Sequence, residues 1–204
     1  MTDAAVNGVP PVKDGVFPPV TDREIACAAE KLVKNLAAAG QTVATCESLT
    51  AGLVAASIAQ VPGASQVLRG GLVTYQTDTK HILAGVNEAI LDDPGPVSSC
   101  CAKAMAIGAR QTTGADWAVS LTGVAGPEPV GIHPVGEVWI GMAFPTGRRF
   151  AARARPEGRH RWGMVLGADK PVPLVDGDRN HIRRVVTCYA LSLLAEQVAQ
   201  TLHG

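Results

Sequence analysis

Ser48 and Lys80 are two residues of this sequence whose chemistry, taken together, could supply a nucleophile and its base. Ser48 stands between a β-prone run, residues 42–45, and a helix-prone run of small residues, 51–59. The free N–H groups and the positive helix dipole at such a junction favour a bound anion or a developing oxyanion. Lys80 could accept the hydroxyl proton, because burial of a lysine lowers its pKa.

Each of these residues also has an ordinary structural interpretation. Ser48 could be a helix N-cap, since serine is a preferred residue there. Tyr75, which precedes Lys80, could orient or relay the proton, but the pair could equally be an interface tyrosine and a solvated lysine. The G-x-S-x-G and S-x-x-K serine motifs are both absent around Ser48. A base for Ser48 must therefore come from elsewhere in the fold.

A third segment with chemical potential is the glycine- and proline-rich stretch Thr122–Glu137, which follows an apolar run at 117–121. Thr122 would lie at the carboxyl end of a buried strand, and a loop of this composition exposes backbone N–H groups around a pocket. The same composition is typical of a surface loop with good turn chemistry. Alone, the segment leaves both interpretations open.

These segments form a set of short motifs in a fixed order: CESLTAG from Cys46, TYQTDTK from Thr74, GPVS from Gly95, TGVAGP from Thr122 and GDR from Gly177. In this order they resemble the CinA C-terminal domain family. The family pattern is similar to E-S-x-T-G-G, T-Y-S-N-x-x-K, G-x-V-S, T/S-G-I-A-G-P and G-D-R. The resemblance covers residues 21–147 and 176–202, which is most of the chain.

The resemblance implies an amidohydrolase that converts nicotinamide mononucleotide and water into nicotinate mononucleotide and ammonia. It implies Ser48 as the nucleophile, activated by Lys80 and Tyr75, with N–H groups at the following helix start holding the oxyanion. The reaction needs neither a metal nor another cofactor. The residues expected to bind the nucleotide or shape its site are Glu47, Thr50, Gly52, Ser98, Thr122, Gly123, Gly126 and Arg179.

The sequence departs from the family pattern at several positions around the expected pocket. Ala51 replaces a glycine, so its methyl group could narrow the approach to the backbone. Thr77 replaces an asparagine, and His133 stands for a lysine in the altered loop 128–136. Two alternatives therefore stay open: a Ser/Lys amidase for a different amide or nucleotide, and a non-catalytic nucleotide-binding module.

The elements that must position these residues alternate between helix and strand patterns, which predicts an α/β fold. We expect a three-layer α/β/α sandwich with a mixed, mostly parallel sheet and ligands at the carboxyl ends of its strands. The predicted strands are 42–45, 70–76, 117–121, 138–144 and 148–154. The predicted helices are 21–39, 49–60, a short one at 77–83, 98–113, and a last one from 178.

Residues 1–20 contain four prolines and no periodicity, so we expect a flexible tail before a single domain at 21–204. Residues 148–175 form an atypical segment, irregular from 156 on, with six arginines between 148 and 161. Those arginines could bind a phosphate or an acidic partner, fold over the site as a lid, or make solvated hairpin or oligomer contacts.

Composition narrows the classes of partner. The chain has 204 residues, 47% of them hydrophobic, with 18 acidic and 18 basic side chains and 4% aromatic residues. This balance argues against nucleic acid or membrane as partner, and no run reaches the ~20 apolar residues of a spanning helix. Five scattered cysteines without a CxxC pair argue against a zinc site or disulfides. We expect a cytoplasmic homo-oligomer without a secretory signal.

Overall fold

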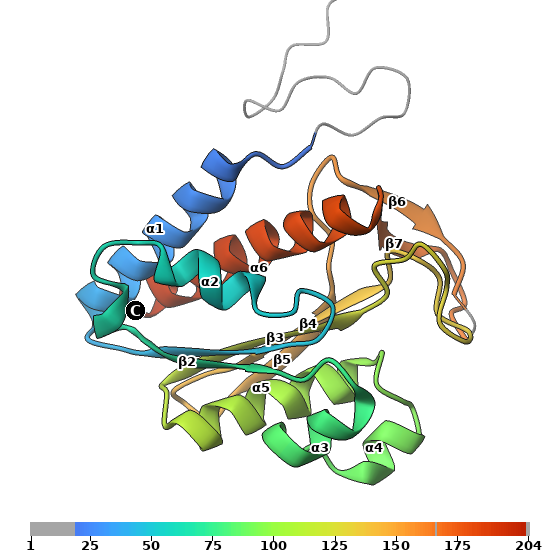
Figure 1. Ribbon diagram of the computed structural model, residues 1–204, viewed down its shortest axis with the longest axis horizontal. Coiled ribbons are helices and arrows are strands. Elements are labelled where there is room, and N and C mark those ends of the chain that lie inside the picture. The colour runs from blue at the N-terminus through green and yellow to red at the C-terminus, as the bar shows by residue number, and fades with distance from the viewer. Residues whose placement is uncertain (1–18, 166, 203–204) are drawn as a thin grey trace, which may run out of the picture.

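A five-stranded mixed sheet lies between two layers of helices in the computed structural model, which describes residues 19–165 and 167–202 (Figure 1). The strand order is β2-β1-β3-β4-β5. β1 is parallel to both β2 and β3, while β4 is antiparallel to β3 and β5, so β4 alone of the five runs in reverse. The predicted three-layer fold with a mixed, mostly parallel sheet is confirmed.

The strands of the main sheet are β1 (Val43–Glu47), β2 (Leu68–Val73), β3 (Trp117–Gly123), β4 (Val138–Ala143) and β5 (Arg149–Arg153). A separate two-stranded sheet pairs β6 (His160–Gly163) with β7 (Val172–Val175). The α-helices are α1 (Asp22–Ala39), α2 (Leu53–Ala59), α3 (Thr77–Ala84), α4 (Glu88–Asp92), α5 (Ser99–Thr113) and α6 (Arg179–Leu202), and η1 (Ala64–Gln66) is a short 3-10 turn.

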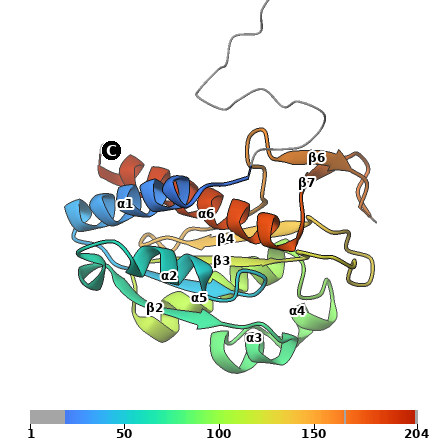
Figure 2. The same cartoon turned by 45° about the horizontal axis from the view of Figure 1, so that its top comes forward.

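The two faces of the sheet carry side chains of different size. Helices α1, α2 and α6 cover one face, and α3, α4 and α5 lie on the other (Figures 1 and 2). Large residues such as Trp117 and Ile140 face the first layer, whereas Ala118 and Cys46 face the second. Small residues let α5 approach closely: a Cβ on Gly141 would collide with the backbone of Ala102 in that helix. This close packing fixes α5 against the sheet.

The two longest helices, α1 and α6, pack against each other over the first face. Thr21 and Glu24 form a capping box at the start of α1, as predicted, and Gly40 ends the helix in the left-handed conformation at φ 62°. By length and composition alone, α6 could cross a membrane. In the structure, one face of α6 is buried in the main hydrophobic cluster, so the same apolar pattern also fits a core helix.

Two parts of the sequence prediction differ from the structure. Residues 156–176 were expected to be irregular, but they contain the β6–β7 pair, in which Trp162 lies opposite Pro173. Most of the predicted tail, residues 1–18, lies outside the described residues. Val20, which the prediction included in the tail, is buried, and its carbonyl accepts hydrogen bonds from Arg184 of α6.

Candidate active site

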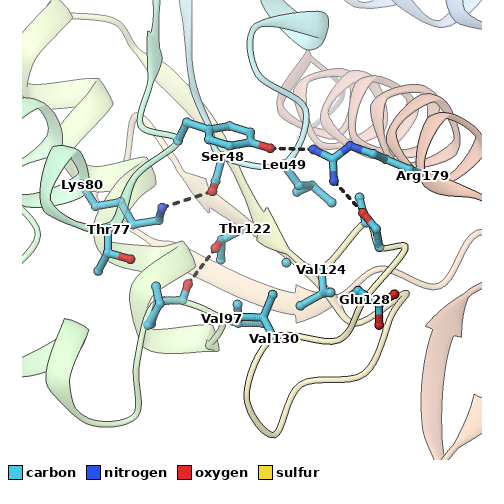
Figure 3. Close-up of a pocket in the computed structure, with 15 residues that line it drawn as sticks. Ser48, Leu49, Thr77, Lys80, Val97, Thr122, Val124, Glu128, Val130 and Arg179 are labelled. Carbon is cyan, nitrogen blue, oxygen red and sulfur yellow. Dashed lines mark hydrogen bonds between the residues drawn. The ribbon is translucent and has the colours of Figure 1, made fainter.

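Ser48 directly follows β1 at the carboxyl edge of the sheet, and the Lys80 side chain reaches it from α3 (Figure 3). The distance between Lys80 Nζ and Ser48 Oγ is 3.1 Å. The Ser48 N–H donates to the carbonyl of Leu121 in β3, which ties the turn to the neighbouring strand. The sequence therefore predicted correctly that these two side chains meet, within the reach needed between a nucleophile and its base.

Lys80 is 2% exposed, although lysine is among the residues least often buried without a charged partner. Burial lowers the pKa of its amine, because the charged form loses its hydration. Burial also raises the pKa of the neighbouring thiols, Cys46 to about 11 and Cys101 to about 12. Both thiols are uncharged at neutral pH and add no anion that would hold the amine protonated. The Thr74 carbonyl, 2.8 Å away, accepts a second hydrogen bond from Nζ.

A pocket of about 210 Å³ opens beside Ser48 and Lys80. Its walls come from the turn after β1, the start of α3, the segment before α5, the loop after β3 and the start of α6. Thr122, at the end of β3, donates its hydroxyl to the Pro96 carbonyl and so joins two of these walls at 2.7 Å. The lining includes Leu49, Thr77, Val97, Gly123, Gly126, Glu128 and Val130.

Arg179, at the upper right in Figure 3, lines the pocket together with Tyr75. Arg179 donates one hydrogen bond to the Tyr75 hydroxyl, at 2.5 Å, and another to the Gly126 carbonyl, at 2.7 Å. Tyr75 was expected to help activate Ser48, but its hydroxyl bonds to Arg179 rather than to Ser48 or Lys80. Tyr75 is 49% exposed, so its ring forms a wall of the pocket.

Glu47 is fully buried and does not reach the pocket. Its carboxylate accepts the N–H groups of Gly52, Val54 and Ala55, at 2.9–3.0 Å, and the Thr45 hydroxyl at 3.0 Å. The sequence analysis expected Glu47 to bind the nucleotide or shape its site, and N–H groups at the helix start to hold an oxyanion. In this structure Glu47 shapes the site from beneath: its carboxylate accepts these N–H groups at the start of α2 and complements the helix dipole.

Three further residues predicted to bind substrate support the site instead. Ser98 caps α5: its hydroxyl accepts from the Cys101 N–H and donates to the Gly95 carbonyl. Gly52 is the N-cap residue of α2 and adopts φ 94°. Thr50 is fully buried and is not among the residues that line the pocket. By contrast, the other predicted binding residues line the pocket: Thr122, Gly123, Gly126 and Arg179.

The substituted positions also lie differently from what the sequence suggested. Ala51 is exposed and absent from the pocket wall, so its methyl group does not narrow the substrate's approach. Its φ of 53° is a left-handed conformation that glycine adopts without strain. His133 points to Glu137, with 2.9 Å between Nδ1 and Oε2. Of the three substitutions, Thr77 is the one that lines the pocket.

Glu137, at the end of the pocket loop, is a second buried carboxylate, 1% exposed. His133, Trp139 and Arg153 donate or bond to it through their side chains. Its backbone carbonyl also accepts a hydrogen bond from the Val124 N–H. A Cβ on Gly123 would collide with that same carbonyl, so the loop and β4 approach each other closely here.

The arginine-rich segment is largely occupied by contacts within the fold. Arg148 lies over the Phe144 ring and donates to Gln197, and Arg155 lies over Trp162. Arg159 and Arg161 pair with Glu24 and Asp176. The residues that line the pocket come from other parts of the described chain. These contacts hold the segment against the rest of the fold, and the pocket lining contains none of residues 148–161.

A family model for the CinA C-terminal domain matches residues 26–164, about two thirds of the chain. The chain belongs to the CinA C-terminal domain family. The match includes Ser48, Lys80 and Thr122, and it ends before α6.

Relatives and solved structures agree with this membership. A CinA-like protein of Frankia casuarinae is 48% identical over 106 residues, which are 52% of this chain and 24% of that protein. The competence/damage inducible protein CihA from Agrobacterium tumefaciens has a TM-score of 0.72 at 29% identity and covers 91% of this chain and 99% of its own. A CinA superfamily protein from Klebsiella pneumoniae has a TM-score of 0.74 at 25% identity, and the match covers 86% of this chain and 98% of that one.

The curated relatives of this CinA-family chain are much longer than it is. The chain spans 24–34% of the first three of them. Their names are putative competence-damage inducible protein and CinA-like protein, and they describe no reaction. The site residues of this domain therefore carry the argument about its chemistry.

Sequence reasoning overlooked Arg183 of α6, which contacts the turn that contains Ser48. Its guanidinium donates to the Leu49 carbonyl from Nε and to the Thr50 carbonyl from Nη2, each at 3.0 Å. A signal was present, since residues four apart on a helix lie on the same face and Arg183 follows Arg179 by four. Arg179 and Arg183 together join α6 to both the pocket wall and the serine turn.

Proposed function

We propose that this CinA-family domain is an amidohydrolase that converts nicotinamide mononucleotide and water into nicotinate mononucleotide and ammonia. The observation that carries the proposal is the 3.1 Å contact between Ser48 Oγ and a 2% exposed Lys80 amine. Burying a lysine without a carboxylate partner lowers the stability of the fold. A buried lysine beside a hydroxyl is therefore a candidate catalytic base. The open pocket beside the pair offers room for an amide.

The proposed reaction uses Ser48 and Lys80 in two steps. The neutral Lys80 amine takes the hydroxyl proton while Oγ bonds to the carboxamide carbon, and the carbonyl oxygen becomes an oxyanion. As the C–N bond breaks, Lys80 returns the proton to the leaving nitrogen, which departs as ammonia. Water then attacks the ester with Lys80 as base, the ester C–O bond breaks, and Ser48 recovers its proton as nicotinate forms.

The pocket walls suit the rest of such a substrate. The half-exposed Tyr75 ring offers an aromatic face on which a pyridine ring can stack. Arg179 holds that ring by its hydroxyl and holds the opposite loop through Gly126, so the width of the pocket is fixed. Preorganised walls of this kind reduce the entropy lost when substrate is positioned.

The test is ammonia release from nicotinamide mononucleotide by the purified chain. Ser48→Ala should lower the rate by at least about 10³-fold, as removal of a nucleophile does in other hydrolases. Ser57→Ala is the matched control, because Ser57 is a buried serine of α2 whose hydroxyl donates to Leu53 away from the pocket. A folded wild-type protein that releases no ammonia from this nucleotide would overturn the proposal.

A second candidate, a Ser/Lys amidase for an amide without a phosphate, is favoured by Glu128. This carboxylate lines the same pocket as Arg179 (Figure 3). A phosphate close to Glu128 would be repelled, whereas a neutral or cationic amide would not. A panel of primary amides separates the two candidates: the nucleotide should have the highest kcat/KM under the first, and an uncharged or cationic amide under the second.

A further inference from the structure

The turn after Ser48 is hydrogen-bonded by a side chain of a helix distant in sequence, Arg183 of α6. Arg183 uses Nε and Nη2 to bind two successive carbonyls, those of Leu49 and Thr50, at 3.0 Å each. A guanidinium presents its donors in a rigid planar fork, so two contacts fix both the position and the orientation of the peptides.

The orientation of these carbonyls determines where the N–H groups point. A trans peptide is planar, and its C=O and N–H point in opposite directions. The Leu49 carbonyl faces Arg183, so the Thr50 N–H points away from α6. The Ser48 carbonyl accepts the Ala51 N–H, which directs the Leu49 N–H away from the turn in the same manner.

These two N–H groups have no acceptor among the described residues, although Leu49 is 4% exposed and Thr50 is fully buried. The Thr50 Oγ1 atom is also buried without a hydrogen-bond partner. Buried N–H groups without a partner are rare, and they call for an explanation where they occur. The other donors near Ser48, at the start of α2, are already taken by Glu47.

We propose that Arg183 is a positioning residue: by binding the Leu49 and Thr50 carbonyls it fixes the turn after Ser48, so that the Leu49 N–H, at the pocket wall, donates to the oxyanion formed when Ser48 attacks an amide. The inference rests on the proposed amidase function and extends it. Donors that are fixed before the reaction stabilise the developing charge without reorganisation. Arg183 itself touches neither the substrate nor Ser48 Oγ; it acts through the two carbonyls.

The test compares Arg183→Ala with Arg184→Ala, its neighbour on α6. Arg184 is the matched control because it binds the Val20 carbonyl and Asp22, away from the site. Arg183→Ala should lower kcat on nicotinamide mononucleotide by about 10²-fold, the scale for loss of an oxyanion donor, and leave KM within about threefold. The kcat of Arg183→Lys should lie between those of the wild type and Arg183→Ala, because one ammonium group cannot bind both carbonyls in the geometry of the guanidinium. Arg184→Ala should keep wild-type kcat.

A second readout does not depend on the natural substrate. Phenylmethanesulfonyl fluoride should label Ser48: the Oγ–S bond forms, the S–F bond breaks, the hydroxyl proton goes to Lys80 and fluoride leaves. Charge develops on a sulfonyl oxygen during this step, so Arg183→Ala should slow labelling by a similar factor and Arg184→Ala should not. Intact mass spectrometry measures the rate, and circular dichroism with thermal melting shows whether each variant is folded.

The outcomes separate this inference from the proposed function. A folded Arg183→Ala variant with wild-type labelling and wild-type kcat would overturn the positioning role while leaving the amidase proposal intact. Normal labelling of the wild type without turnover of the nucleotide would overturn the proposed substrate and leave the positioning role supported by the labelling difference. A wild-type Ser48 that is never labelled and never turns over would overturn both. If Arg183→Ala does not fold, Arg183→Lys replaces it in the same comparison.

Discussion

Glu47 and Glu137 are both fully or almost fully buried carboxylates beside the pocket, yet the protein satisfies them in different ways. Three backbone N–H groups and one hydroxyl, all within eight residues of Glu47, donate to its carboxylate. Glu137 is bound by side chains, the ring of His133, the indole of Trp139 and the guanidinium of Arg153. The first site is built into the start of a helix, and the second joins a loop to a sheet.

The difference teaches what each carboxylate can tolerate. The three backbone N–H partners of Glu47 can only donate, and they are shared between its two oxygens, so both oxygens must accept. One partner of Glu137, the His133 ring nitrogen, can donate or accept according to its tautomer. The N–H groups at the start of α2 therefore require acceptor oxygens, while the His133 partner of Glu137 can change its role.

The largest effect should follow Glu47→Gln, which turns one acceptor oxygen into an NH₂ group that faces N–H donors. If the NH₂ group takes the place of Oε1, the Ala55 N–H loses its acceptor, whereas Gly52 and Val54 keep theirs. We expect a loss of about 1–3 kcal/mol in the free energy of unfolding. Urea denaturation measures it, and kcat should fall because Ser48 is the next residue. A variant as stable as the wild type would contradict the all-acceptor role of this carboxylate.

Glu137→Gln should cost less, about 1 kcal/mol, because the new NH₂ group can donate to His133 Nδ1 while the remaining oxygen still accepts from Arg153. Urea denaturation under the same conditions gives the direct comparison with Glu47→Gln. If the two substitutions cost the same, the distinction between backbone and side-chain partners does not matter for stability. His133→Ala in the Glu137→Gln background should then remove the compensation.

The pH dependence of activity should report the protonation of Lys80, which lies on the Glu47 side of the pocket beside Ser48, and should not depend on Glu137. Burial lowers the pKa of Lys80, and the amine must be neutral to accept the Ser48 proton. We expect kcat/KM to rise with pH, by up to about tenfold per pH unit, and to level off at a midpoint below the ordinary lysine value of 10.5. Glu137→Gln should leave this midpoint unchanged. A profile that falls over the same range would exclude Lys80 as the base.

The smallest effect should come from Ala51→Gly, in the turn stabilised by Glu47. Ala51 has a φ of 53° and an exposed side chain, so glycine removes strain and loses little packing. We expect a gain of about 0.5–1 kcal/mol in the free energy of unfolding. Ala37→Gly, at an exposed position inside α1, is the control and should lose about 1 kcal/mol. Thermal denaturation of both variants should show shifts of opposite sign.

Much of the fold and the centre of the site followed from the sequence. Alternating periodicities predicted the layers, and parallel strands end at the same edge, which brings Ser48, Lys80 and Thr122 together. The β6–β7 pair was missed because Pro171 and Pro173 indicate irregular structure. A proline fits there because β7 pairs with β6 alone and lies at the edge of its sheet.

At the site, the sequence did not reveal which hydrogen-bond partner each polar side chain has. Glu47 ends β1 just before the turn into α2, and Ser98 is the N-cap of α5. A polar residue that precedes a helix has the same sequence signal whether it caps the helix or binds a substrate. Only the direction of the side chain distinguishes them, and here both turn to backbone N–H groups. Tyr75 shows a related difficulty. Its position five residues before Lys80 suggested a shared role, but its hydroxyl accepts a hydrogen bond from Arg179, 104 residues away in the sequence.

The four-residue spacing of Arg179 and Arg183 has a consequence for changes in chain length. Each residue of an α-helix turns by about 100°, so one residue inserted between them would carry one arginine away from its carbonyl. The described residues of the segment that links β6 to β7 show no such pair of side-chain contacts, and lengthening this link costs little, because loop-closure entropy grows slowly with length. Insertions and deletions during divergence should therefore collect between Gly163 and Val172 and be excluded from the first turns of α6.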